Sequence, residues 1–289
     1  MNIIRASQLG MCFGVRDAID LAFEHAAAAP LTILGDLVHN PDVLGALRAK
    51  GIAVAADPAR VTTGTVMITA HGASERALAG TRALGLTVVE ATCPLVRVAH
   101  RAILALVRDG YHPVIIGQRG HVEVRGLTED LDAFDVVLDE RDIDALAGRP
   151  RIGVAAQTTQ PLTKVRHLVD LIRQRFPESA VKFMDTVCQP TKLRQNAAVD
   201  LARRSDVVIV IGGANSNNTR ELVSTCSRHC ARVHHVQSEA DLCPDWFLET
   251  DTVGITAGTS TPDAVIDLVH DRIYRLKACP DINVSQASA

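Results

Sequence analysis

Residues 2–19 read NIIRASQLGMCFGVRDAI, which is an apolar run, a short loop with a cysteine and then a helical pattern. The same order returns in residues 86–103, LTVVEATCPLVRVAHRAI, and in residues 181–199, VKFMDTVCQPTKLRQNAAV. Segments that recur in this way indicate a chain built from repeated structural units. The sequence therefore predicts three related units, each with one cysteine at the same place: Cys12, Cys93 and Cys188.

Two more kinds of segment follow each cysteine in a fixed order. The second kind is an apolar run that ends in glycine and a polar loop, and its copies present His39, His121 and residues 215–218. Their distances from the cysteine are nearly equal, at 39 − 12 = 27, 121 − 93 = 28 and 215 − 188 = 27 residues. The third kind is an apolar run that leads into a loop of small and hydroxyl-bearing residues, where we expect three matched positions: His71, Thr158 and Ser260.

Short runs of valine and isoleucine alternate with helical periodicity along the chain. Val165, Leu168, Val169 and Ile172, for example, recur at three- and four-residue steps, which is typical of one apolar face of a helix. Continuous apolar runs indicate strands buried on both faces of a mainly parallel sheet, so the predicted class is α/β. Ligands of such sheets gather beyond the carboxyl ends of the strands, and we expect three units around one central cavity.

Composition disfavours several classes of protein. The chain has 289 residues, and its 30 basic and 33 acidic side chains give a net charge of -3, so no general positive field attracts nucleic acid. Aromatic residues, at 3%, offer few surfaces for stacking bases. No apolar run approaches the roughly 20 residues of a membrane span, and the first residues lack an export signal. We therefore expect a cytoplasmic protein with no nucleic-acid or membrane partner.

Three cysteines at matched positions favour a metal centre, although a lone cysteine is more often a small buried apolar residue. Three thiolates and a water would suit zinc, and three thiolates would also hold an iron–sulfur cube with one iron left without a protein ligand. The spacing does not separate these alternatives. Cys226 and Cys230 lack a second ligand pair, so we expect them to pack in the core, and Cys243 and Cys279 support no function.

Histidines and small polar residues in the strand-end loops indicate an anion site. Imidazolium groups, hydroxyls and backbone N–H groups at helix N-termini together bind a phosphate or a diphosphate. The candidate residues are His39, His71, His121, Ser216, Asn217, Asn218 and Ser260. Each histidine taken alone is better explained by a local hydrogen bond, and metal ligation is a further alternative, although the sequence has no HExxH pair.

Glu123, two residues after His121 in GHVEVRG, is the candidate proton donor. A carboxyl group inside a closed cavity has its pKa raised toward neutrality, which suits general acid catalysis. An exposed loop glutamate is the competing interpretation. The HxE pattern also begins a zinc deaminase signature, but the PCxxC that completes that signature does not follow.

Nine motifs, in order along the chain, match one family: GMCFGV, LVHN, AHGAS, ATCPLV, GHVEV, QTT, DTVCQPTKLRQ, GGANSNNTREL and TAGTSTPD. The chain resembles the 4-hydroxy-3-methylbut-2-enyl diphosphate reductases, the last enzymes of the non-mevalonate isoprenoid pathway, up to about Lys277. The resemblance implies three α/β units in a pseudo-threefold trefoil around a central 4Fe-4S cluster. The units would be residues 14–93, residues 94–184, and residues 1–13 with 185–277. Residues 278–289 are expected to form a loose tail.

The resemblance also implies a role for each candidate residue. Cys12, Cys93 and Cys188 would hold the cluster, and the iron without a cysteine would bind the substrate hydroxyl. Glu123 would deliver protons with Thr158, which resembles the family threonine at that hydroxyl, and Thr159 is a weaker candidate. The diphosphate would be held by His39, His71, His121, Ser216, Asn217, Asn218 and Ser260. Three residues depart from the common family pattern: Met11, Val122 and Asn217.

The predicted reaction is a reductive dehydroxylation of (E)-4-hydroxy-3-methylbut-2-enyl diphosphate to isopentenyl and dimethylallyl diphosphate. The sequence has no GxGxxG fingerprint for a nicotinamide or flavin, so the electrons would come from a separate ferredoxin or flavodoxin. A hydro-lyase that uses the open metal as a Lewis acid is the rival enzyme, and it needs no reductant. A cluster-bearing sensor is the rival outside the enzymes, and it could dispense with Glu123.

Overall fold

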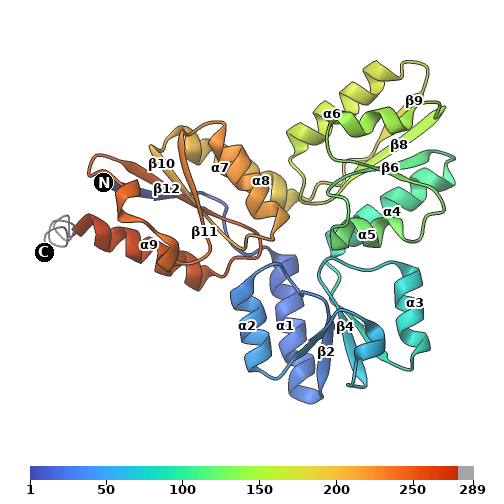
Figure 1. The fold of residues 1–289 in the computed structure, drawn as a ribbon, viewed down its shortest axis with the longest axis horizontal. Coiled ribbons are helices and arrows are strands. Elements are labelled where there is room, and N and C mark those ends of the chain that lie inside the picture. The colour runs from blue at the N-terminus through green and yellow to red at the C-terminus, as the bar shows by residue number, and fades with distance from the viewer. Residues whose placement is uncertain (279–289) are drawn as a thin grey trace, which may run out of the picture. The chain divides into compact units, whose positions relative to one another are not determined.

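The computed structural model describes residues 1–278, so the predicted tail, apart from Ala278, and Cys279 lie outside the described residues. The chain forms two compact units, and Figure 1 labels their helices and part of their strands. The terminal unit comprises Met1–Cys12 and the chain from Leu193 onward. The internal unit comprises Phe13–Lys192.

Three four-stranded sheets, parallel throughout, organise the described residues. The sheet of the terminal unit has the order β1 (Asn2–Arg5), β12 (Thr252–Ala257), β10 (Val207–Ile211) and β11 (Arg232–Val236). The first sheet of the internal unit has the order β5 (Thr87–Glu90), β4 (Thr65–Ile68), β2 (Leu31–Leu34) and β3 (Ala53–Ala55). The second has the order β9 (Ala180–Phe183), β8 (Arg151–Ala156), β6 (His112–Ile116) and β7 (Asp135–Val137).

The three sheets share one strand order, which confirms the repeat and the α/β class predicted from the sequence. In each sheet the edge strand β1, β5 or β9 leads to a candidate cysteine, and its neighbour β12, β4 or β8 leads to the third kind of loop. The next strand, β10, β2 or β6, leads to the second kind of loop. Because the strands are parallel, the three loops leave the same edge of each sheet. The unit boundaries at residues 13/14, 93/94 and 184/185 stay a prediction.

Helices connect the strands and cover the sheets. The α-helices are α1 (Phe13–Ala28), α2 (Pro41–Ala49), α3 (Glu75–Ala83), α4 (Pro94–Arg108), α5 (Val122–Thr128), α6 (Leu162–Arg175), α7 (Gln189–Arg203), α8 (Asn217–Ser227) and α9 (Asp263–Ala278). Short 3-10 helices lie at Pro58–Arg60, Glu140–Leu146, Glu239–Asp241 and Pro244–Trp246. Among the helices that the structure describes, none has both the length and the apolar content needed to cross a bilayer.

Strand β10 illustrates why continuous apolar runs form these sheets. Val207, Ile209 and Ile211 pack with residues of α9, whereas Val208 and Val210 pack on the other face with residues of α7 and α8. The second sheet of the internal unit has the same two-sided core, with α6 on one face and α4 on the other. Because successive side chains of a strand point to opposite faces, a strand covered on both sides needs apolar residues throughout.

Cys226 and Cys230 belong to the apolar cluster between β10 and the helices α7 and α8. Burial raises the pKa of Cys226 to about 12, so its thiol stays protonated. The prediction that these two cysteines pack in the core is confirmed.

Candidate functional site

Each candidate cysteine lies directly before a helix. Cys12 precedes α1, Cys93 is the N-cap residue of α4, and Cys188 precedes α7. Their backbone N–H groups make matching hydrogen bonds to carbonyl oxygens of the third kind of loop: Cys12 to Thr259 at 3.1 Å, Cys93 to Ala70 at 3.0 Å and Cys188 to Thr158 at 3.0 Å. The repeat seen in the sequence therefore extends to equivalent hydrogen bonds at the three cysteines.

The surroundings of the three thiols suit metal ligation. None of the three forms a disulfide, and all are partly buried. The positive end of a helix favours the negatively charged thiolate, which is the form that binds metal. The backbone of Gly14 lies directly against Sγ of Cys93, where a side-chain Cβ would overlap the sulfur. Three such thiols fit an iron–sulfur cluster, and their convergence on one cluster stays a prediction.

The third kind of loop is shifted by one residue from the expected match in its second copy. In each copy a backbone N–H donates to the carbonyl three residues earlier: Gly72 to Thr69, Gln160 to Gln157 and Thr261 to Gly258. These turns, like the hydrogen bonds from the cysteines, align His71 with Thr159 and Ser260. Thr158 instead corresponds to Ala70 and Thr259. Because Thr158 and Thr159 are identical residues, the sequence alone did not reveal the shift.

The second kind of loop ends in an N-cap residue whose side chain accepts a backbone N–H. Asn40 Oδ1 accepts from Asp42 and Val43 at 3.0 and 3.2 Å, and Ser216 Oγ accepts from Thr219 at 3.3 Å. His121 Nδ1 accepts from Glu123 at 3.1 Å. These caps are equally far from the cysteines, since 40 − 12, 121 − 93 and 216 − 188 are all 28. Sequence reasoning counted from His39 and so missed Asn40, which is buried with 3% exposed.

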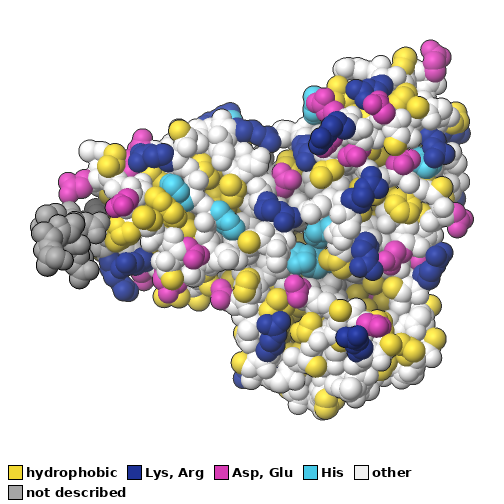
Figure 2. Space-filling model, in the orientation of Figure 1, with side chains coloured by type: hydrophobic (Ala, Val, Ile, Leu, Met, Phe, Trp, Pro, Cys, Tyr) yellow, Lys and Arg dark blue, Asp and Glu magenta, His cyan; other side chains and the backbone are white. Residues whose placement is uncertain are grey.

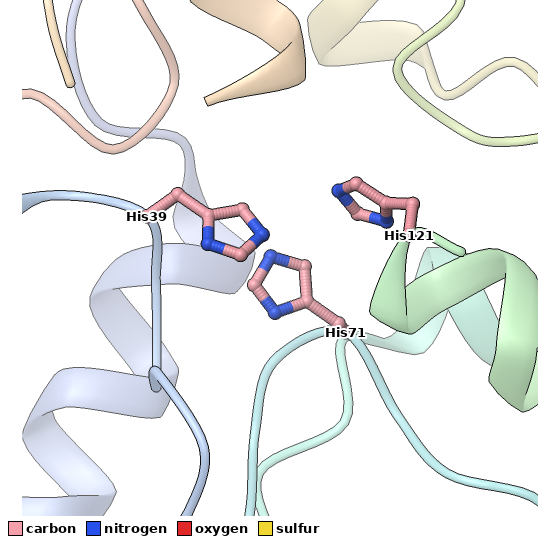
Figure 3. Close-up of side chains that lie close together, drawn as sticks. All are labelled: His39, His71 and His121. Carbon is pink, nitrogen blue, oxygen red and sulfur yellow. The ribbon is translucent and has the colours of Figure 1, made fainter. Parts of the chain in front are cut away.

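Three predicted histidines from separate loops of the internal unit come together, as Figure 3 shows. The rings of His39 and His71 stack with their centroids 4.3 Å apart. His121 approaches both rings edge-on, at 5.3 and 5.6 Å. Burial, with added repulsion from His39 and His121, holds the pKa of His71 well below its usual value. His71 is therefore neutral at pH 7 unless an anion binds beside it.

The hydrogen bond between His121 and Glu123 indicates whether the histidines suit an anion or a metal ion. Nδ1 of His121 is the acceptor, so the neutral ring has its proton on Nε2 and presents a donor there. Nitrogen atoms of the three histidines lie within 4.8 Å of one another, which is close enough for a metal ion. A metal bound at Nε2 of His121 would require loss of that proton or of the hydrogen bond to Glu123. The arrangement therefore favours an anion over a cation.

Glu123 lies in the first turn of α5 and is buried, with 2% exposed. The backbone N–H of Thr158 donates to its Oε1 at 2.7 Å. Burial raises the pKa of Glu123 to about 7, against the lowering effect of hydrogen bonds from the backbone and side chain of Thr158. The competing interpretation of an exposed loop glutamate is wrong. A carboxyl group with this pKa gives up and regains a proton at neutral pH, as a general acid must.

A short series of hydrogen bonds joins four predicted residues of the internal unit. His121 accepts from the N–H of Glu123, and the carboxylate of Glu123 accepts from the N–H of Thr158. The carbonyl of Thr158 then accepts from the N–H of Cys188. An anion-binding candidate, the candidate acid and a candidate metal ligand are thus linked by hydrogen bonds that are all donated by backbone N–H groups.

The terminal unit places its predicted residues around the start of α8. Ser216, Asn217, Asn218 and Ser260 are all buried, with at most 5% exposed. Asn218 Oδ1 accepts from the N–H of Thr259 at 3.0 Å, and the carbonyl of Thr259 accepts from Cys12. Asn218 Nδ2 is buried and makes no hydrogen bond within the described chain, so it is available to a ligand.

The surface in Figure 2 shows basic and acidic side chains interspersed on both units. No extended basic stripe appears on the face shown. This distribution agrees with the balanced charge of the sequence.

Sequence comparison identifies relatives along almost the whole chain. The model of the LytB protein family matches residues 3–274. The 4-hydroxy-3-methylbut-2-enyl diphosphate reductase of Pelobacter propionicus is 37% identical over 275 residues, which cover 94% of this chain and 98% of that protein. A protein of the same name from Geobacter sulfurreducens is also 37% identical, over 94% of this chain and 97% of its own length.

Solved structures also resemble the chain, and two of them are named as reductases. One is an (E)-4-hydroxy-3-methyl-but-2-enyl diphosphate reductase, described as the terminal enzyme of the non-mevalonate pathway. It has a TM-score of 0.68 and 35% identity, and the match covers 95% of this chain and 99% of that one. The E-1-hydroxy-2-methyl-but-2-enyl-4-diphosphate reductase of Plasmodium falciparum has a TM-score of 0.88, with 24% identity over 99% and 93% of the two chains, and it supports the fold alone.

Proposed function

Because the chain belongs to the LytB protein family, we propose that it reduces (E)-4-hydroxy-3-methylbut-2-enyl diphosphate to isopentenyl and dimethylallyl diphosphate. The reaction takes up two electrons and two protons, breaks the allylic C–O bond and releases water. Addition of the second proton at either end of the allyl group gives the two products. The local observation that supports this proposal is the buried Glu123, a proton donor tied to both a histidine and a cysteine loop.

Cys12, Cys93 and Cys188 would hold the 4Fe-4S cluster through their thiolates. When bound, the cluster supplies electrons one at a time and Lewis acidity at the iron that has no cysteine ligand. The support from this chain is the matched set of three cysteines, each before a helix and each bonded through its N–H to an equivalent loop. The motif match favours iron–sulfur over zinc, which the cysteine spacing had left open.

Glu123 is the residue that we propose to protonate the leaving oxygen. Its pKa of about 7 leaves an appreciable fraction protonated at neutral pH, and its burial keeps the proton from exchanging freely with bulk water. Thr158 orients the carboxyl group through its N–H and contributes its side chain to the substrate hydroxyl. Glu123 lies in the first turn of α5, which follows β6, and Thr158 lies in the loop at the carboxyl end of β8.

The diphosphate is proposed to bind the two sets of candidate residues at the strand ends. The set from the sequence is His39, His71, His121, Ser216, Asn217, Asn218 and Ser260. We also propose Asn40 and Thr159 from their matched positions. Asn40 corresponds to His121 and Ser216, and Thr159, the weaker candidate at the substrate hydroxyl, corresponds to His71 and Ser260. Neutral donors such as Nε2 of His121 and amide groups bind phosphate oxygens without the repulsion that three adjacent imidazolium rings would suffer.

The electrons are proposed to come from a reduced ferredoxin or flavodoxin in the cytoplasm. The resemblance implies such a donor, and the chain has no nicotinamide or flavin fingerprint to take its place. A one-electron protein donor matches the single-electron chemistry of iron–sulfur clusters.

Anaerobic purification with iron and sulfide analysis, followed by assay with and without reductant, tests the proposal. We expect about four iron and four sulfide per chain and product formation only when a reductant is present. Turnover without reductant would instead identify the hydro-lyase. An intact cluster with no turnover on the allylic diphosphate would identify the sensor.

Substitution of the proton donor tests its role separately from the cluster. We expect Glu123→Gln to lower kcat by about 10²- to 10⁴-fold, because general acid catalysis contributes effects of that size. Iron content and substrate binding should be retained. Glu178→Gln, at an exposed position of the internal unit, is the matched control. Equal kcat values for Glu123→Gln and the control would remove Glu123 from the mechanism.

A further inference from the structure

Arg194 is a buried, positively charged residue that belongs neither to the proposed cluster ligands nor to the proposed substrate-binding residues. It lies on α7, six residues after Cys188, with only 5% exposed. Its Nε and Nη2 both donate to one backbone carbonyl, that of Gly10, at 3.0 and 2.7 Å. Gly10 and Arg194 both belong to the terminal unit, and Gly10 is two residues before Cys12. Two nitrogen atoms of a buried guanidinium group thus donate to the backbone of a candidate metal-ligand loop.

The loop that ends at Cys12 is held at three backbone groups. The N–H of Gly10 donates to Ala257 at 3.3 Å, and the N–H of Cys12 donates to Thr259 at 3.1 Å. Both of these bonds join backbone to backbone, so no side-chain substitution removes them directly. The carbonyl of Gly10 is held instead by the side chain of Arg194.

Gly10 adopts a conformation that fixes the direction of this loop. Its φ of +74° lies in the left-handed region that favours glycine. A Cβ at this position would lie 2.9 Å from Cδ1 of Ile266 and 3.1 Å from Oδ1 of Asp263. The turn at Gly10 therefore lies in a tight space against α9, and the orientation of its carbonyl is part of the loop's geometry.

The Cys12 loop has more need of such a restraint than the other two. Cys93 follows the end of β5 by 93 − 90 = 3 residues, and Cys188 follows the end of β9 by 188 − 183 = 5 residues. Cys12 follows the end of β1 by 12 − 5 = 7 residues. Each added residue adds backbone freedom that must be lost when the cysteine is fixed in place.

We propose that Arg194 is the positioning residue of Cys12, holding the Gly10 carbonyl so that the thiolate is presented in the geometry that the cluster requires. This inference rests on the proposed role of Cys12 as a cluster ligand. Groups that orient metal ligands from behind typically change metal affinity by about 10- to 100-fold when they are removed. Arg194 would orient Cys12 in this way by holding the backbone of its loop at Gly10 rather than by contacting the sulfur.

Three variants of the anaerobically loaded protein test the proposal. Arg194→Met removes the donors and the charge but keeps an unbranched apolar stem, and Arg194→Lys keeps one donor group and the charge. Arg204→Met is the control, because Arg204 is exposed and its guanidinium group bonds to Asp200. The measurements are iron and sulfide per chain, the rate of iron loss to a ferrous chelator, and the electron paramagnetic resonance spectrum of the reduced cluster. Circular dichroism and thermal melting report folding.

We expect Arg194→Met to release iron about tenfold faster than the parent or more, with an altered spectrum of the cluster that remains. Arg194→Lys should lie between Arg194→Met and the parent, and Arg204→Met should match the parent. Wild-type iron release and an unchanged spectrum in both Arg194 variants would overturn the proposal. If Arg194→Met does not fold, the rate of iron release and the cluster spectrum of Arg194→Lys test the proposal by themselves. Failure of the parent protein to hold a cluster would contradict the proposed function instead, before any variant is compared.

Discussion

The internal and terminal units present the same kinds of loop from the same strand order, yet they place different chemistry in them. At matched N-cap positions the internal unit has His121 and the terminal unit has Ser216. At matched positions of the third loop the pair is His71 and Ser260. Imidazoles change charge near physiological pH, whereas hydroxyls and amides do not. If both sets bind the diphosphate as proposed, the histidines of the internal unit should make binding sensitive to pH, whereas the donors of the terminal unit should not.

The largest expected effect concerns the buried acid of the internal unit. The pKa of Glu123 is about 7 in the folded protein and 4.5 in its ordinary state, so ionisation opposes folding as pH rises from about 4.5 through 7. The full penalty above pH 7 is about 3 kcal/mol, from 1.36 kcal/mol per unit of pKa shift. Glu123→Gln lacks this group. We therefore expect the variant to gain stability relative to the parent between pH 5 and 8, measured as the difference in melting temperature at each pH. A difference that is constant with pH would mean that Glu123 is not buried as a titrating acid.

A smaller effect is expected from charge placed at the matched caps. Asn40→Asp keeps an oxygen that can cap α2 but adds a negative charge, and Asn40→Ser keeps a neutral cap. If Asn40 faces the diphosphate, the aspartate should raise KM by about tenfold, which corresponds to about 1.4 kcal/mol of repulsion. Ser216→Asp should act in the same direction in the terminal unit. Equal KM values for Asn40→Asp and Asn40→Ser, with unchanged iron content, would show that Asn40 only caps its helix.

The smallest expected effect is a change in how steeply the affinity for the diphosphate depends on pH. The pKa of His71 is low in the free protein because of burial and the neighbouring histidines, and a bound diphosphate would raise it. Binding then takes up a proton, so affinity rises as pH falls from 8 to 6. In His71→Asn the ratio of the affinities at pH 6 and pH 8 should be smaller than in the parent by a few-fold. Titration calorimetry on the anaerobic protein measures both affinities. Ser260→Ala, at the matched position, should weaken binding without changing the slope. Parallel pH profiles for the two variants would contradict the division between the units.

The sequence predicted those features that depend on local pattern and spacing. Repeated apolar runs and cysteines predicted three related sheets, because a strand buried on both faces leaves a continuous apolar run wherever it occurs. The meeting of His39 and His71 could also be predicted, because they follow β2 and β4 of one parallel sheet, whose carboxyl ends lie at one edge. His121 follows β6 of another sheet, and its approach was expected only from the prediction that related units share a cavity. The burial of Glu123 was undecided, because exposure depends on what packs over a residue rather than on its neighbours in sequence.

Other features needed the coordinates for definite physical reasons. The one-residue shift between Thr158 and Thr159 is visible only in backbone hydrogen bonds, since two identical side chains give no pattern. Asn40 was not predicted, because the neighbouring His39 was matched to His121 by residue type. The common interval of 28 residues, which identifies Asn40 as the matching position, was present in the sequence. The contact between Arg194 and Gly10 joins residues 184 positions apart, and no local periodicity predicts such a contact.

The pairing of β1 with β12 determines when during synthesis the terminal sheet is complete. Asn2 pairs with Thr252, so 252 − 2 = 250 positions separate the two partners. Among the described strands the ribosome makes β1 first and β12 last, and long-range pairing of this kind is slow to form. Thr259, which accepts the N–H of Cys12, emerges later still. A nascent chain therefore contains Ala70 and Thr158, the acceptors of Cys93 and Cys188, well before it contains Thr259, the acceptor of Cys12. Binding of the proposed cluster by all three cysteines would then have to await the synthesis of Thr259.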